Sequence, residues 1–198
     1  MNNSRSDLQK QSTGTPSKDK HMNSRRSSIE SYIRAKDENR PDLLRHSFKV
    51  SATAALTVNT SNISFPSTLC GLTEISETLV RRFNQTYENI YTFCIGDAPL
   101  GKPTSHTCQW LVGMSTKESK EIRIGCGKYE WSFDPETGLA TFLHIHIDQM
   151  RTGPAQELEP LMDWLRTLDY PWCKARKAKS QIPSLSTLEN ITPYLVSI

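Results

Sequence analysis

The chain has 198 residues, of which 36% are hydrophobic and 23% are charged, and its net charge is +3. This composition is typical of one globular domain with a hydrophobic core, and no apolar run approaches the ~20 residues of a membrane helix. Basic residues concentrate near the two ends, in SKDKHMNSRR and KARKAK, so we expect neither nucleic acid nor a membrane as a partner.

The N-terminal segment, residues 1–26, is rich in Ser, Asn, Lys, Arg and Asp and is expected to form a disordered polar tail. Order is predicted to begin at Ser27, which forms an S-x-x-E capping box with Glu30 at the start of a helix. Asn39 is expected to cap a second short helix, with Pro41 in its first turn.

A strand is predicted over residues 51–58, SATAALTV, which is rich in Thr, Ala and Val. NTSN then forms a turn, and ISF is expected to return as a short strand. Thr73 is expected to cap a third helix, in which apolar side chains recur every fourth residue up to Phe83.

The middle of the chain favours a series of β-strands, since its segments are rich in aromatic and β-branched residues. These predicted strands cover residues 87–96, 106–114, 121–133 and 139–148. Gly125 and Gly127 interrupt the third of them, which indicates a bulge or a sharp bend.

A final helix is predicted from the spacing i, i+3, i+4 and i+7 of its apolar residues, which are Leu161, Trp164, Leu165 and Leu168. Tyr170-Pro171 is expected to end this helix. Residues 171–198 include KARKAK and show no sustained period, so they are expected to form a basic C-terminal tail. The predicted domain therefore covers residues 27–170.

The cysteines indicate the redox environment of the chain. They are odd in number and no two form a C-x-x-C pair: Cys70, Cys94, Cys108, Cys126 and Cys173. This pattern argues against a zinc cage or a disulfide framework. Because the N-terminus also lacks a hydrophobic signal segment, we expect a cytoplasmic protein with reduced thiols.

Three segments together resemble a known superfamily: IESYIRAKDENRPDLLRHSF, GLTEISETLVRRF and YEWSFDPETGLATFLHIHI. Their order over residues 27–150 is similar to the nuclear transport factor 2-like superfamily, and to its SnoaL-like and ketosteroid isomerase branches. The resemblance implies an α+β cone, in which three helices of the N-terminal half wrap a curved antiparallel sheet of about four to six strands. It also implies a concave pocket and a convex dimer face, whereas the predicted final helix lies outside the usual core of the superfamily.

The implied pocket is mostly apolar and has few polar groups, which is how small-molecule sites are built. The residues expected to line it are Tyr32, Leu56, Trp110, Tyr129, Trp131, Leu143, Ile145 and Ile147. Such a pocket would suit a flat hydrophobic molecule with few oxygen atoms. A cone filled by its own side chains is the alternative.

The resemblance can be tested residue by residue for catalysis. It places Tyr32 at the oxyanion-donor position of ketosteroid isomerase-like members, Leu56 at their aspartate base, and Tyr129 at their second carboxylic acid. Leucine cannot abstract a proton, so isomerisation by that mechanism is not expected. The remaining catalytic candidates are Tyr32 and Tyr129 as hydrogen-bond donors and His46 as a base. Structural roles fit the same residues.

Three functions therefore stay open. The first is a SnoaL-like protein that binds a small hydrophobic molecule. The second is a cofactor-free isomerase, cyclase or dehydratase that acts on a carbonyl compound. The third is a dimeric interaction module with a filled core. The residues imply no cofactor.

The segment FLHIHIDQ places His144 and His146 on one face of a strand. The resemblance puts the alternate residues toward the pocket, so both histidines are expected on the convex face, in a dimer interface or in solvent. A metal ion there would need further ligands, and the neighbouring strand offers Glu130 as the plausible one. We therefore predict a homodimer face and no metal site.

Overall fold

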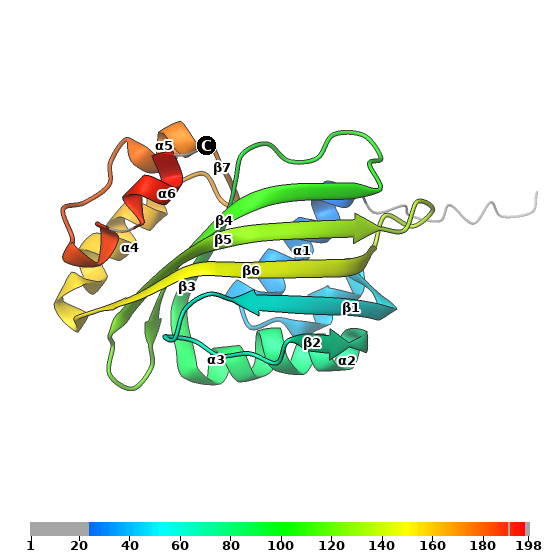
Figure 1. Cartoon of the computed structure of the whole chain (residues 1–198), viewed down its shortest axis with the longest axis horizontal. Helices are drawn as coiled ribbons and strands as arrows, with labels where there is room; N and C mark the ends of the chain where they lie inside the picture. The colour runs from blue at the N-terminus through cyan, green and yellow to red at the C-terminus, as the bar shows by residue number, and fades with distance from the viewer. Residues whose placement is uncertain (1–23, 190, 197–198) are drawn as a thin grey trace, which may run out of the picture.

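The computed structural model describes residues 24–189 and 191–196, so most of the polar tail predicted for residues 1–26 lies outside the described residues. Figure 1 shows the strands as one curved sheet with helices on both of its faces. The strands are β1 (Phe48–Val58), β2 (Thr68–Cys70), β3 (Tyr87–Ile95), β4 (Ser105–Thr116), β5 (Ile122–Phe133), β6 (Ala140–Gly153) and β7 (Trp172–Cys173). The helices are α1 (Arg25–Asp37), η1 (Pro41–His46), α2 (Gly71–Ser76), η2 (Glu77–Arg82), α3 (Phe83–Thr86), η3 (Ala155–Glu157), α4 (Leu158–Arg166), α5 (Ala175–Lys179), η4 (Ser186–Leu188) and α6 (Thr192–Val196).

The sheet order is β2-β1-β6-β5-β4-β3-β7. Strands β3 to β6 form an antiparallel meander, whereas β1 joins β6 and β7 joins β3 in parallel. The predicted α+β cone is confirmed, but the described residues form a sheet of seven strands rather than the expected four to six. The additional strands β2 and β7 have three and two residues, too few to show a period in the sequence.

The connection after β1 differs from the prediction. Residues 63–65 form a loop and not a returning strand, and the chain pairs with β1 only at β2, where Leu69 lies opposite Ala54. Ile63 and Phe65 pack against the apolar cluster under the sheet. Their hydrophobic character therefore reflects burial of a loop and not pairing of a strand.

Helix α1 begins earlier than predicted. Its N-cap is Ser24, whose hydroxyl accepts a hydrogen bond from the Ser27 amide at 3.0 Å. The capping box predicted at Ser27 and Glu30 is therefore wrong, because Ser27 already lies inside the helix and the Glu30 carboxylate accepts from the Trp172 indole at 3.0 Å. Asn39 has a left-handed φ of 52° in the turn before η1, which is a 3-10 helix, and so is not its cap.

The third predicted helix runs continuously through α2, η2 and α3, with π geometry in η2. It begins at Gly71, before the predicted Thr73, and the Glu74 carboxylate accepts a hydrogen bond from the Cys70 amide at 2.7 Å. This contact supplies the cap that a side chain before the helix does not provide. The predicted apolar positions are buried, at Ile75, Leu79 and Phe83.

Buried side chains form two clusters on opposite faces of the sheet. On the concave face, α1 and the α2–α3 helix pack against β-strand residues that include Tyr129 and Ile145. On the convex face, Phe93, Leu111 and Ile124 contact the C-terminal helices. Successive side chains of a strand point to opposite faces of the sheet, so consecutive residues of one strand can belong to different clusters.

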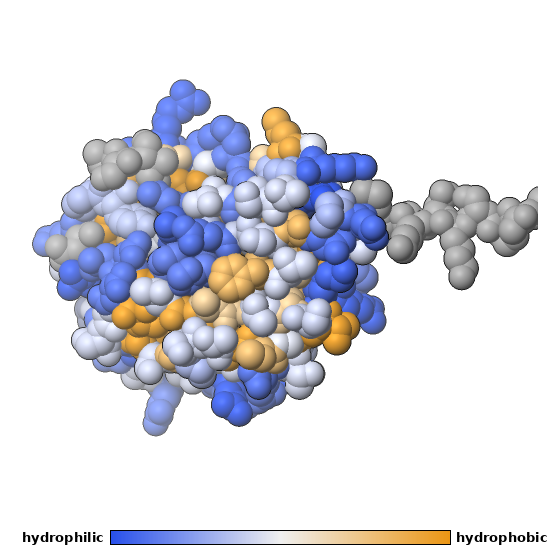
Figure 2. Space-filling model, turned by 45° about the vertical axis from the view of Figure 1, so that its right-hand side comes forward, coloured by the Kyte–Doolittle hydropathy of each residue, from blue (hydrophilic) through white to orange (hydrophobic). Residues whose placement is uncertain are grey.

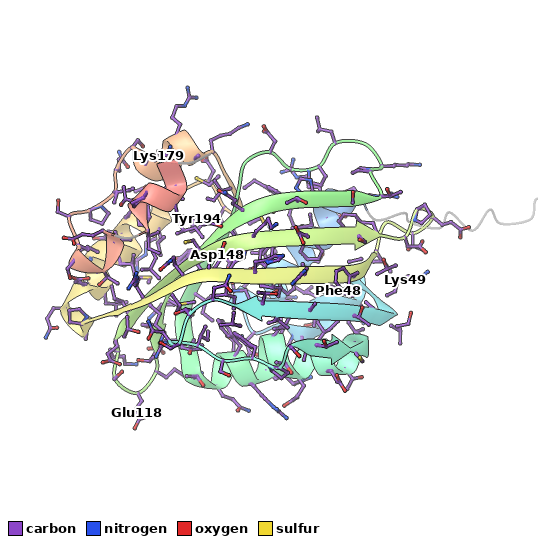
Figure 3. The ribbon with its side chains drawn as sticks, in the orientation of Figure 1. Phe48, Lys49, Glu118, Asp148, Lys179 and Tyr194 are labelled. Carbon is purple, nitrogen blue, oxygen red and sulfur yellow. The ribbon has the colours of Figure 1, made fainter. Side chains whose placement is uncertain are left out.

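Residues 172–196 form part of the folded unit, apart from residue 190, which is not described. The segment was expected to be a basic tail beyond residue 170, but β7, α5 and α6 pack on the sheet beside α4 (Figure 1). Tyr194 of α6 donates to the Asp148 carboxylate of β6 at 3.0 Å (Figure 3). No helix in the described ranges is long and apolar enough to cross a membrane.

The predicted bulge at the glycines is confirmed. Cys126 of β5 pairs with Gln149 and Gly127 pairs with Ile147, so Asp148 is the extra residue on β6. A Cβ atom on Gly127 would lie 1.9 Å from the His146 carbonyl oxygen, which only glycine avoids. Because of this extra residue, Ile147 and Met150 both belong to the concave cluster although they are three positions apart.

Candidate functional site

The concave cluster contains a cavity of about 50 Å³, lined by residues of the sheet, of α1 and of the α2–α3 helix. Side chains expected to line a pocket do line it, namely Tyr32, Leu56, Trp110, Tyr129, Ile145 and Ile147. One buried water needs about 10–15 Å³ by this kind of measure, whereas small-molecule pockets occupy about 300–1,000 Å³. In this conformation the cavity therefore holds only a few atoms.

Trp131 and Leu143 were also expected in the pocket wall, but the structure buries them away from the cavity, with exposed fractions of 1% and 0%. The Trp131 ring lies 5.5 Å from the Tyr32 ring and 5.8 Å from the Phe48 ring, measured between centroids. These aromatic rings fill the end of the cone that is built from the start of β1 and the end of β5. Packing thus closes the pocket at that end.

Tyr32 and Tyr129 supply polar groups to the otherwise apolar cavity. Their rings meet edge to face with centroids 6.0 Å apart. Burial raises the pKa of both phenols well above the usual value. Both hydroxyls therefore remain protonated near neutral pH, and they can donate hydrogen bonds but cannot act as bases.

His46 does not belong to this site. It lies at the end of η1 with an exposed side chain, accepts a hydrogen bond from the Arg45 guanidinium at 3.2 Å, and is not among the residues that line the cavity. The expected role as a base is therefore not supported. The physical reason is that η1 packs through Leu44, which turns the two residues after it outward.

Lys36 is a polar residue of the cavity that the sequence reasoning missed. Its ammonium group donates to the carboxylate of Asp37 at 2.7 Å and to the Thr92 hydroxyl at 2.5 Å, and it lies 5.0 Å from the centroid of the Phe83 ring. Lys36 follows Tyr32 by four residues on α1, so helical spacing already placed it on the same face.

The Asp37 carboxylate is saturated by the groups around it. It accepts hydrogen bonds from the Thr92 amide at 2.7 Å, from the Thr92 hydroxyl at 2.8 Å and from the Tyr170 hydroxyl at 3.1 Å. Its side chain is only 3% exposed. Asp37 thus holds Lys36 in the cavity wall and links α1 to β3 and to the chain before β7.

A surface hollow of about 520 Å³ adjoins the cavity. Three side chains line both spaces, namely Ile63, Phe65 and Phe83. The rings of Phe65 and Phe83 stack with centroids 6.5 Å apart. The loop between β1 and β2 and the last turn of the third helix therefore form the partition between the cavity and the hollow.

The two histidines lie on the other side of the sheet. Leu143, Ile145 and Ile147 belong to the concave cluster, so His144 and His146 project from the convex face of β6. Both are partly exposed and both contact Glu130 of β5. They take no part in the cavity.

No protein-family model matches the sequence, and no functionally curated protein is similar to it. Solved structures do share its fold. A putative isomerase from Rhodopseudomonas palustris is 16% identical and superimposes with a TM-score of 0.51 over 63% of this chain and 87% of that chain. A nuclear transport factor 2-like protein from Burkholderia thailandensis is 12% identical, with a TM-score of 0.50 over 64% and 92%. The chain therefore has the nuclear transport factor 2-like fold, as its sequence pattern predicted.

Proposed function

We propose that this protein binds a small, mainly apolar molecule that carries at least one hydrogen-bond acceptor. The observation that carries the proposal is the apolar cavity whose lining includes the two buried tyrosines, Tyr32 and Tyr129. Apolar walls supply affinity by burying surface, and a few fixed donors orient the ligand. A ketone, aldehyde or lactone oxygen would accept from the tyrosines, and the Lys36 ammonium adds a donor.

Entry of such a ligand requires the cavity to join the adjoining hollow. Ile63, Phe65 and Phe83 separate the two spaces, and two of these residues lie on the loop between β1 and β2. Side-chain rotation or a shift of this loop would merge them into a space within the range of small-molecule pockets, about 300–1,000 Å³. The loop therefore acts as a lid in this proposal.

Binding is favoured over proton transfer by the groups that line the cavity. Both phenols keep their protons, Leu56 occupies the position where the resemblance implied a base, and Lys36 is the single charged residue among those described in the lining. Asp37, the nearest carboxylate to Lys36, is engaged by several donors. A cofactor-free isomerase, cyclase or dehydratase remains an alternative that would need a base from elsewhere.

The third candidate is an interaction module with a filled core. The small volume of the cavity, about 50 Å³, favours it, because a filled cone needs no ligand. A binding protein should become more stable when apolar carbonyl compounds are added, whereas an interaction module with a filled core should not.

A thermal-unfolding screen of the full chain with cyclic ketones, aromatic aldehydes and lactones tests the proposal. A compound at about 100 times its Kd should stabilise the protein by about 2.7 kcal/mol. Leu56→Phe should fill the cavity and abolish the shift. Val50→Phe, on the same strand but 80% exposed, is the matched control and should keep it. Absence of any shift with the unmodified chain would support the filled-core module and overturn the proposal.

A further inference from the structure

A cluster of three potential metal ligands lies on the convex face, on the opposite side of the sheet from the cavity. The β5–β6 register places Glu130 opposite His144 and Lys128 opposite His146. Because alternate residues of each strand point to the same face, Glu130 and both imidazoles project outward together. This site is independent of the proposed ligand cavity.

The geometry of the cluster resembles that of a coordination sphere. The Glu130 Oε2 atom lies 3.1 Å from His146 Nε2 and 3.5 Å from His144 Nδ1, and one ligand atom from each residue lies within 4.8 Å of the others. Ligands at about 2.0–2.1 Å from a tetrahedral metal ion are about 3.3–3.4 Å from one another. Small side-chain movements would therefore bring all three atoms to a single ion.

We propose that Glu130, His144 and His146 bind a divalent first-row transition metal ion, with zinc as the representative case. Two imidazole nitrogens and one carboxylate oxygen form a donor set that suits such ions and not Mg²⁺ or Ca²⁺, which prefer oxygen ligands. Three protein ligands leave further coordination positions open. These positions face solvent, because the three side chains are 21–39% exposed.

Neighbouring side chains already orient two of the ligands. The Thr57 hydroxyl lies 2.9 Å from His144 Nε2, so it can accept a hydrogen bond from the Nε2–H group and leave the lone pair of Nδ1 toward Glu130. The Lys128 ammonium lies 2.6 Å from Glu130 Oε1, which leaves Oε2 toward the histidines. The positive charge of Lys128 also opposes a cation, so it limits the affinity of the site.

The C-terminal helices leave this region of the convex face open. In Figure 1 they lie at one end of the sheet, and Tyr194 reaches β6 at Asp148, beyond the histidines (Figure 3). Figure 2 turns the other end of the sheet forward and shows apolar side chains among hydrophilic ones on that surface. An ion can therefore reach the cluster from solvent.

The test is a calorimetric titration of the tag-free full chain with Zn²⁺ alone, in a Cys70→Ser background that removes the exposed cysteine. We expect one ion per chain, and no saturable binding of Mg²⁺. His146→Gln and Glu130→Gln should each weaken zinc binding by at least about 10-fold, since each removes one ligand. His46→Gln removes an exposed histidine outside the cluster and should leave the affinity unchanged.

Two further measurements separate coordination from a simple histidine–glutamate ion pair. Lys128→Gln should tighten zinc binding, because it removes the competing positive charge beside Glu130. Melting temperatures without metal show that each variant is folded before its affinity is compared. Zinc binding that is absent, or that is unchanged in folded His146→Gln and Glu130→Gln, would overturn the proposal.

Discussion

The polar side chains of the concave face show how single residues decide what the cavity can do. Lys36 and Asp37 are adjacent in sequence, and their side chains are only 8% and 3% exposed. Such a pair is tolerated because Thr92 hydrogen-bonds to both side chains and Tyr170 donates to the Asp37 carboxylate. The same network prevents Asp37 from acting freely as a base.

Removal of one member of this pair should be costly. Lys36→Met leaves the Asp37 carboxylate buried without a counter-charge, and we expect the free energy of unfolding to fall by about 3 kcal/mol. Arg82→Met breaks an exposed pair with Glu77, with side chains 68% and 43% exposed, and should cost less than about 1 kcal/mol. Urea denaturation measures both, and equal losses would contradict the buried-pair argument.

The bulge glycine provides a second prediction at this scale. In Gly127→Ala the new Cβ would meet a backbone oxygen at 1.9 Å, whereas in Gly113→Ala it would meet the Leu165 Cδ1 atom at 2.3 Å. A side-chain end can rotate away and a strand backbone cannot. We therefore expect a loss of more than about 3 kcal/mol for Gly127→Ala and about 1–3 kcal/mol for Gly113→Ala, measured by chemical denaturation. The reverse order would show that β6 can shift.

At the scale of elements, the helices after β6 are too short to be stable alone, and side-chain contacts with the rest of the fold stabilise them. Helices of three to nine residues are marginal alone, so η3, α4 and η4 depend on tertiary contacts. Glu157 of η3 accepts hydrogen bonds from Ser186 at 2.9 Å and from Thr187 at 2.5 Å, both on η4. The Glu157 carboxylate therefore connects η3 to η4.

This connection predicts a pH dependence of stability. The hydroxyl donors, Thr187 first, lower the pKa of Glu157 in the folded state. A lowered folded-state pKa stabilises the protein above the unfolded-state value of about 4.3, and that stabilisation is lost as the pH falls through the folded-state pKa. Glu157→Gln should therefore be less stable than the unmodified chain at pH 6, and the two should converge as the solution is acidified. Urea denaturation across this range measures the difference, and a constant difference would contradict the assignment.

For the whole molecule, the main feature is a sheet covered on both faces. The helices on the concave face form the cone, and the C-terminal segment covers one end of the convex face with residues such as Leu188, Ile191 and Leu195. These side chains are at most 2% exposed. The segment thus supplies a second core, and it restricts any dimer contact to the remaining part of the convex face.

The energetic role of this second core is testable. Leu188 is 2% exposed, and Leu188→Ala should lower the free energy of unfolding by about 2–5 kcal/mol through lost burial and a residual cavity. Leu100 is 89% exposed, and Leu100→Ala should have little effect. Equal effects in denaturant titrations would mean that the C-terminal segment does not contribute to the cooperative unit.

Homodimer formation through the uncovered convex face remains a prediction. Light scattering coupled to size exclusion should find a dimer in the absence of metal, and His144→Ala combined with His146→Ala should weaken it. Zinc binding is measured separately, so a monomer would contradict the dimer without affecting the proposed metal site. A dimer that persists in the double variant would place the interface elsewhere.

Local patterns predicted much of the fold and part of the site. The long strands, the bulge at Gly127 and helix α4, which carries Leu161 and Leu165, follow from periodicity and from glycine, which act within a few residues of sequence. The same alternation put Ile145 and His144 on opposite faces of the strand, and the resemblance to the superfamily assigned Ile145 to the concave face. The side of a helix or strand on which a residue lies depends only on the period of that element, and the sequence alone therefore determines it.

Contacts between distant segments were decided only by the tertiary structure. Strands β2 and β7 exist because longer strands offer them an edge, and the described residues that follow β7 pack on the sheet because the convex face offers an apolar surface. The volume of the cavity depends on how Trp131 and Phe65 pack, which no periodicity records. Glu130 meets the histidines, and Asp37 meets Thr92 and Tyr170, because strand register and helix packing bring residues far apart in sequence to within a hydrogen bond.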